Sequence, residues 1–171
     1  MRSQQILACC AILITLTCKA PEDARASVRT FVQDFYTWYV PRARDDSAAA
    51  MNGVLRARSD ALAPELAAAL KEDLAAQEKA SGEIVGLDFD PFLASQDPCE
   101  RYEVGEVKAQ GSRYRVAIHG VCSGTRSSQP EVTAEVAKQN DRWTIVNLHY
   151  AEGADLSSQL KLLRDARDRE R

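Results

Sequence analysis

Apolar residues early in the chain recur every three or four positions, as they do along one face of a helix. Ser27 is a typical N-cap residue, and Pro41 disfavours continuation of a helix, so the pattern predicts a helix that begins after Ser27 and ends at Pro41. The apolar stripe of this helix is rich in aromatic side chains and consists of Val28, Phe31, Val32, Phe35, Tyr36 and Tyr39.

A second helical pattern lies between Asp60 and Ala80, with leucines at four-residue intervals (Leu66, Leu70 and Leu74). Pro64 suits the first turn of this helix, and the dipeptide 81–82 (Ser-Gly) is typical of a helix end. The intervening residues 42–60 are charged and Ala-rich and contain Asn-Gly at 52–53. We expect them to form a loop with room for one helical turn.

The second half of the chain shows the alternation of strands. Residues 99–122 predict one β-hairpin with its turn at Gln110 and Gly111, a register that places Cys99 opposite Cys122 and Glu106 opposite Arg115. Directly opposed residues are close enough for a disulfide, so we predict a Cys99–Cys122 bridge. The same register predicts an apolar face of Val107, Tyr114, Val116 and Ile118 and a polar face of Glu106, Lys108, Arg113 and Arg115.

A second hairpin is predicted around Asn140 and Asp141, and it pairs Val136 with Ile145 and Glu135 with Val146. Each face of this hairpin is only partly apolar, which is expected of a sheet that is covered by helices on one side and opens in part into a cleft. A terminal helix with Leu156, Leu160 and Leu163 on one side then follows, and residues 166–171 form a charged tail.

Residues 1–20 have the pattern of a secretory signal peptide, with Arg2 followed by a short apolar run from Ile6 to Leu16. Cleavage after Ala20 would release a soluble periplasmic protein. The alternative is a lipid anchor at Cys18, although the preceding Leu-Thr makes a poor lipoprotein signal. In both cases the chain enters an oxidising compartment, where the two cysteines beyond the leader are expected to pair.

Size and charge narrow the possibilities further. Residues 21–165 suit a single domain, and no second apolar run is long enough to span a membrane. The formal net charge of the whole chain is −3 with both signs interspersed. No basic stripe is present, so nucleic acid is not an expected partner.

The order of elements predicts an α+β fold, in which the N-terminal helices pack on a curved, cone-like, four-stranded antiparallel sheet and a short helix follows. Together with the phrases DFDPFLASQDPC, GVCSG and WTIVNLHY, this order resembles a family of exported bacterial domains of unknown function with a cystatin-like or nuclear-transport-factor-like fold. The resemblance spans about residues 24–163. It implies a fold and an exported location but no activity, cofactor or catalytic residues.

Candidate chemistry is sparse. His119 and His149 are the only histidines, and no nucleophile elbow, phosphate loop, zinc motif or calcium loop is present, so we expect neither a metal nor a cofactor. The sequence therefore favours a non-enzymatic binding or interaction module for a small apolar ligand or a protein partner, with a small pocket enzyme using a His/Asp acid–base pair as the alternative. The predicted functional surface lies where the first helix faces the sheet and consists of Tyr36, Tyr39, Asp88, Asp90, Asn147 and His149. The alternative is that Asn147 and His149 point to solvent on the outer face of the sheet, away from the first helix.

Overall fold

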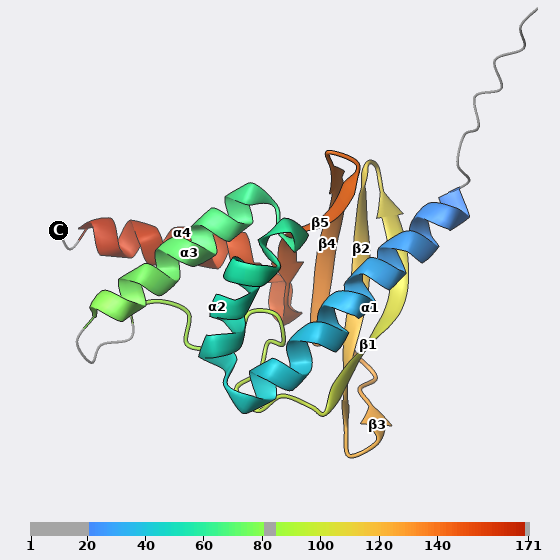
Figure 1. Ribbon diagram of the computed structural model, residues 1–171, viewed down its shortest axis with the longest axis horizontal. Helices are drawn as coiled ribbons and strands as arrows, with labels where there is room; N and C mark the ends of the chain where they lie inside the picture. The colour runs from blue at the N-terminus through green and yellow to red at the C-terminus, as the bar shows by residue number, and fades with distance from the viewer. Residues whose placement is uncertain (1–20, 81–84, 170–171) are drawn as a thin grey trace, which may run out of the picture.

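The structure is a computed structural model that describes residues 21–80 and 85–169. The predicted signal peptide, the alternative anchor at Cys18 and the predicted helix end at 81–82 lie outside the described residues. Three helices come first, α1 (Pro21–Asp45), α2 (Ser47–Ala57) and α3 (Pro64–Lys79). An antiparallel sheet and a last helix, α4 (Leu156–Arg169), follow (Figure 1). The predicted α+β class and element order are confirmed.

The first helix is longer than the sequence pattern indicates. It begins at Pro21, and it continues through Pro41 to Asp45. Tyr39, Val40 and Ala43 are buried on either side of Pro41. Packing of this last stretch therefore outweighs the local cost of a proline, which is itself exposed.

The predicted loop 42–60 is also wrong in part, because most of it forms α2. Asp46 caps this helix, and its side chain accepts a hydrogen bond from the Ala49 amide at 2.9 Å. Ala50, Met51 and Val54 are buried, so packing against α1 stabilises a segment whose Asn52-Gly53 pair disfavours helix on propensity alone.

Four strands pair in the order β1 (Arg101–Gln110), β2 (Arg113–Cys122), β4 (Val132–Gln139) and β5 (Arg142–His149), and all of these pairings are antiparallel. A two-residue strand, β3 (Thr125–Arg126), folds back on the end of β2. This is the predicted meander with one small addition. Short 3-10 turns lie at Ser59–Ala61 (η1) and Ala151–Gly153 (η2).

The first hairpin turns one residue later than predicted. Gln110 pairs with Arg113, and Gly111 has a φ of +60°, which glycine adopts without steric cost. Arg115 therefore lies opposite Lys108, and the predicted pairing of Arg115 with Glu106 is wrong. A bulge between Val104 and Val107 then shifts the strands back by one residue.

The disulfide prediction is confirmed despite this shift. Cys99 and Cys122 are bonded, and their Cα atoms lie 4.7 Å apart. In the second hairpin, Val136 lies opposite Ile145 as predicted, but Glu135 lies opposite Asn147 rather than Val146 because an irregularity interrupts the ladder beside Glu135.

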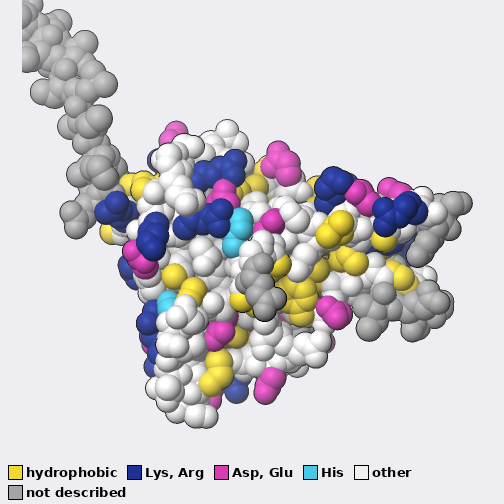
Figure 2. Space-filling view, turned by 180° about the vertical axis from the view of Figure 1, so that it is seen from behind, with side chains coloured by type: hydrophobic (Ala, Val, Ile, Leu, Met, Phe, Trp, Pro, Cys, Tyr) yellow, Lys and Arg dark blue, Asp and Glu magenta, His cyan; other side chains and the backbone are white. Residues whose placement is uncertain are grey.

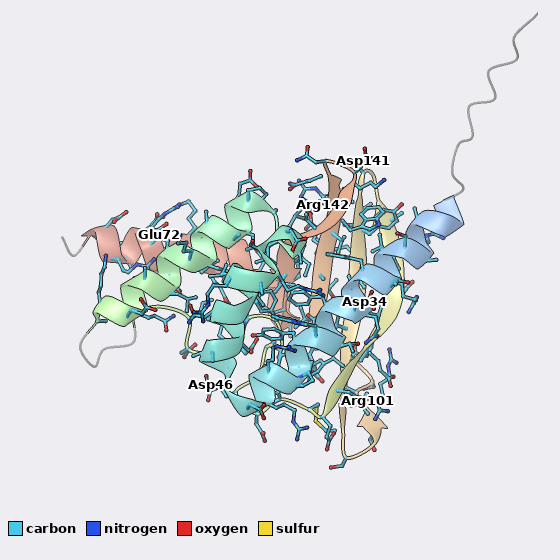
Figure 3. All side chains as sticks on the ribbon, viewed as in Figure 1. Asp34, Asp46, Glu72, Arg101, Asp141 and Arg142 are labelled. Atoms are coloured by element: carbon cyan, nitrogen blue, oxygen red, sulfur yellow. A yellow bond between two sulfur atoms is a disulfide. The ribbon has the colours of Figure 1, made fainter. Side chains whose placement is uncertain are left out.

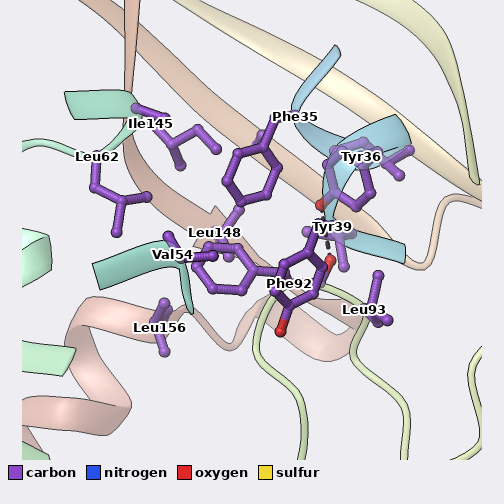
Figure 4. Packing of buried hydrophobic residues seen from close by; sticks show 14 of the residues in the cluster. Phe35, Tyr36, Tyr39, Val54, Leu62, Phe92, Leu93, Ile145, Leu148 and Leu156 are labelled. Carbon is purple, nitrogen blue, oxygen red and sulfur yellow. Dashed lines mark hydrogen bonds between the residues drawn. The ribbon is translucent and has the colours of Figure 1, made fainter. Parts of the chain in front are cut away.

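The core lies between α1 and one face of the sheet and is filled with side chains. Phe35, Tyr36, Tyr39 and Phe92 are at most 1% exposed, and their rings contact one another (Figure 4). Alternate strand residues complete this inner face, among them Val116, Ile118, Val132, Ala134, Val136, Ile145 and Leu148.

The opposite face of the sheet points away from α1. Glu103, Lys108, Arg113, Arg115, His119, Glu135 and His149 belong to this outer face. Among the main strands of the described chain, α3 and α4 pack mainly on β5. In the view from behind, charged side chains lie at the surface over the sheet (Figure 2).

α4 ends at Arg169, so residues 166–169 of the predicted tail are helical. Arg167 donates to Asp73 of α3 at 2.8 Å and to the Val85 carbonyl at 2.9 Å. These contacts explain why the helix does not end before the charged stretch, since Asp73 is 1% exposed and needs a partner.

Candidate binding surface on the outer face of the sheet

Glu135 lies at the centre of the outer face. It stands on β4 between Ala134 and Val136, which are both fully buried in the core, so the alternation of the strand directs its side chain to the opposite face. The side chain is nevertheless only 10% exposed, because neighbouring side chains cover it. A carboxylate this deeply covered needs charged or hydrogen-bonded partners.

Three basic side chains from two neighbouring strands provide those partners. Arg113 Nη1 donates to Glu135 Oε1 at 2.5 Å, and Arg115 Nη2 lies 3.3 Å from Oε2. His149 Nε2 lies 2.8 Å from Oε2 and carries the proton in this contact, since an ionised carboxylate only accepts. The strand register explains why the guanidinium of Arg115 lies next to this carboxylate, because Arg115 is directly opposite Glu135.

The surroundings of Glu135 lower its pKa. Burial acts to raise it, but hydrogen bonds from Arg113 and His149 and the charges of Arg115 and Arg113 outweigh this effect and hold the pKa below its ordinary value. Glu135 is therefore ionised at neutral pH. One carboxylate faces two guanidinium groups, so the centre of the outer face has an excess of positive charge.

Along β1 and β3 at the periphery of this face, too, basic side chains outnumber acidic ones. Lys108 contacts Glu106 at 2.9 Å, and Glu103 lies between Arg101 at 3.1 Å and Arg126 at 3.6 Å. With Asp155, which lies beside His149, the outer face and its edge thus have five cations against four acids on a chain whose net charge is −3. Lys and Arg side chains gather over the sheet in the view from behind (Figure 2). The face consists of Arg101, Glu103, Glu106, Lys108, Arg113, Arg115, Arg126 and Glu135, with the two histidines between them.

His119 is nearly covered on this face, at 7% exposed. Its Nδ1 lies 3.0 Å from the Ser127 carbonyl, and because a carbonyl only accepts, Nδ1 carries the proton. The ring packs over Gly105, where any Cβ would lie 2.7 Å from His119 Nε2. Gly105 thus makes room for the imidazole.

The six residues predicted as a functional surface do not form one site. Tyr36 and Tyr39 are buried in the core, where their hydroxyls donate to the Phe92 carbonyl and to Asp90 Oδ2, both at 2.7 Å. Burial, with further contributions from nearby groups including Asp90, raises the pKa of both tyrosines. Of the predicted set, the structure therefore brings Tyr39 and Asp90 together, but inside the core.

Asp90 is a structural carboxylate. It accepts from Tyr39, from Ser47 Oγ at 2.7 Å, and from the amides of Phe92 at 2.9 Å and Leu93 at 3.2 Å. Burial is the main cause that raises its pKa, and these hydrogen bonds act in the opposite direction. Asp88 is exposed, and both acids line a cavity of about 530 Å³ between α2, α3 and the segment 87–98.

Asn147 and His149 lie apart from the tyrosines. Asn147 organises the start of α4, because its Oδ1 accepts from Ser157 N at 3.1 Å and its Nδ2 donates to Asp155 at 2.8 Å. His149 lies on the outer face beside Glu135. These two side chains therefore do not line a cleft next to α1, because they contact the start of α4 and Glu135 instead.

Nothing in the sequence pattern marks Glu135 as the centre of a charged cluster. The alternation of the first hairpin does indicate that Arg113 and Arg115 share one polar face, and the structure confirms this. The missing information was the pairing of β2 with β4 across the connection 123–131, which brings Glu135 opposite Arg115.

Other cavities lie elsewhere. One of about 400 Å³ lies between α3, α4 and β5, and one of about 620 Å³ lies between α1 and the β4–β5 turn, where Asp34, Asp141 and Arg142 border it (Figure 3). Within residues 21–80 and 85–169, no three His, Cys, Asp or Glu side chains group as a metal site requires. No helix in these same ranges has the length and apolar character needed to cross a bilayer.

Comparison with known proteins adds no relative: no protein-family model, curated protein or solved structure matches the chain significantly.

Proposed function

We propose that the chain is an exported, non-enzymatic interaction module that binds an acidic protein partner through the outer face of its sheet. The observation that supports this most is the excess of positive charge around Glu135, with Arg113 56% and Arg115 31% exposed in their side chains. A partner that presents carboxylates would complement this face and be steered to it over a distance.

The filled core favours this version of the binding hypothesis over an apolar ligand held between helix and sheet. The aromatic stripe of α1 contacts Phe92 and the sheet directly, and Tyr36 and Tyr39 use their hydroxyls in buried hydrogen bonds. A ligand at that position would have to displace a packed core at a cost of several kcal/mol.

The pocket-enzyme alternative has weaker support. Asp90, a candidate partner for a histidine, is already saturated by Tyr39, Ser47 and two amides. His149 does lie beside a carboxylate, but Arg113 and Arg115 keep that carboxylate ionised, and His149 is absent from the lining of the cavities described above. A general acid or base needs a substrate within reach in a cleft.

Capture from a bacterial periplasmic extract tests the proposal. The immobilised domain (residues 21–171) is compared with the charge-reversed variant Arg113→Glu/Arg115→Glu and with Lys71→Glu/Lys79→Glu, which changes the net charge equally on the exposed side of α3. We expect the wild type and the α3 variant to retain the same acidic protein at low salt and release it as salt increases, and the outer-face variant to lose it. Equal retention by all three, or loss from the α3 variant only, would contradict the proposal.

Export is tested separately by the mass of the protein recovered after expression in bacteria. We expect cleavage after Ala20 and extraction without detergent. A lipid-modified N-terminus at Cys18 would establish the alternative anchor, and retention of residues 1–20 would contradict export.

A further inference from the structure

A groove of about 750 Å³ lies at the end of the molecule where the connection 127–131 passes the start of α4. The segment 150–154, which includes η2, forms another part of its wall. Phe89 and Tyr150 meet in this wall with their ring centroids 5.5 Å apart and their planes nearly perpendicular. Small or apolar residues continue the surface, namely Ala94, Pro130, Ala151 and Ala154.

This groove differs in charge from the outer face. Among its described lining residues, Glu131 is the one member of the acidic or basic residue types, and the other polar members include Ser127, Ser128, Gln129 and Gln159. The outer face, by contrast, is dominated by arginines. The two surfaces therefore suit different ligands, and an aromatic corner with few charges is typical of sites for small neutral molecules.

Gln159 gives the groove an unused hydrogen-bond acceptor. Its Oε1 is the one buried side-chain nitrogen or oxygen atom without a hydrogen-bond partner in the part of the chain that the structure describes. Buried polar atoms are almost always paired, so an orphaned oxygen beside a groove indicates a missing donor. The last torsion angle of a glutamine side chain is soft, so turning this buried oxygen toward a donor in the groove costs little.

Ala94, on the same wall, has an unusual backbone conformation. Its φ is +50°, a left-handed value that costs a non-glycine residue about 1 kcal/mol or more. The turn is held by hydrogen bonds from the amides of Leu93 and Ala94 to the Asp90 carbonyl, at 3.3 and 2.8 Å. Strain of this kind is often retained where a wall must keep a particular shape.

The geometry points to a binding site for a small neutral molecule with an aromatic or aliphatic body and an amide-type N–H group. The body packs against Phe89 and Tyr150, and the N–H donates to Gln159 Oε1. The volume is in the range of known small-molecule sites, about 300 to 1,000 Å³. This inference does not depend on the proposed function, because none of these residues belongs to the outer face.

Ligand titration followed by NMR tests the inference with defined probes. Benzamide has an aromatic ring and an amide N–H, whereas methyl benzoate has a similar shape and no donor. We expect benzamide to shift the signals of Phe89, Tyr150 and Gln159 and to bind more tightly than methyl benzoate. The Arg113→Glu/Arg115→Glu variant should bind benzamide like the wild type, which separates this site from the outer face.

Two substitutions complete the test. Gln159→Met keeps the length of the side chain but removes the acceptor, so benzamide should bind about five-fold more weakly, the effect of one neutral hydrogen bond. The same variant should be at least as heat-stable as the wild type, because it removes an unpaired buried oxygen. Ala154→Leu fills the groove and should abolish binding of both probes.

Three results would overturn the inference. They are the absence of benzamide shifts at these residues, equal affinity for the two probes, and an unchanged benzamide affinity in Gln159→Met. A lower melting temperature of Gln159→Met would also contradict it, since the amide would then have a structural partner.

Discussion

Asp90 and Glu135 are both covered carboxylates, yet their surroundings shift their pKa values in opposite directions. Burial dominates at Asp90 and raises its pKa, whereas two arginines and a histidine lower that of Glu135. Because the pKa of Asp90 is raised on folding, the folded state loses stability as pH increases from the ordinary pKa of this group to its raised value. Because the pKa of Glu135 is lowered on folding, its ionisation adds stability above its ordinary pKa of 4.5. The first acid supports the core, and the second supports the outer face.

Removal of the Asp90 carboxylate should destabilise the domain strongly. We expect Asp90→Ala to lower the free energy of unfolding by about 3 kcal/mol, because Tyr39, Ser47 and two amides lose their acceptor inside the core. Asp88→Ala is the matched control, since that side chain is exposed, and it should stay within about 0.5 kcal/mol of the wild type. Urea unfolding measures both, and equal effects would show that Asp90 has no structural role.

The stabilising effect of Glu135 should depend on pH. Because its pKa is lowered on folding, the stability that its ionised form adds is present above pH 4.5 and is lost as pH decreases through the lowered value. Glu135→Gln should therefore be less stable than the wild type by about 2 kcal/mol at pH 7, and the difference should shrink as the pH approaches 3. A constant difference between pH 7 and 3 in urea unfolding would contradict this assignment.

At the scale of elements, the disulfide holds the open end of the first hairpin together. The bridge spans 23 residues, and the chain-entropy model gives about 3 to 4 kcal/mol of stabilisation for a loop of this size. Reduction should lower the melting temperature clearly, whereas the Cys99→Ala/Cys122→Ala variant should not respond to the reductant. Two free thiols in the oxidised protein, counted by alkylation, would refute the bridge.

The elements show how far a sequence pattern reaches. Helical spacing predicted α1 and α3, and alternation predicted both hairpins, because these signals are local. The end of α1 and the existence of α2 depend on packing of Tyr39, Ala43 and Val54 against other elements, which propensity cannot include. The turn at Gly111 and the bulge near Val104 each shift the pairing register of the first hairpin. The two shifts are opposite in direction, so Cys99 and Cys122 still lie close enough to bond.

At the scale of the whole molecule, charge is distributed unevenly. The chain has a net charge of −3, but cations exceed acids on the outer face, and α1 covers the opposite face.

The fold class followed from the order of elements. The candidate site did not, because it requires the pairing of β2 with β4, two strands separated by a polar connection whose length leaves the register undetermined. The sequence pattern predicts Asn147 and His149 in a cleft facing the first helix. The irregularity in the ladder beside Glu135 shifts the pairing of β5 by one residue, so these two side chains reach the outer face instead.

Binding of an acidic probe to the outer face is the central claim, and titration of the isotope-labelled domain with a poly-glutamate peptide tests it most directly. We predict that amide signals around Arg113, Arg115 and His149 shift at low salt, that added salt reverses the shifts, and that Arg113→Glu/Arg115→Glu removes them. Shifts centred on Lys71 and Lys79 of α3, or shifts that persist in the charge-reversed variant, would contradict the claim.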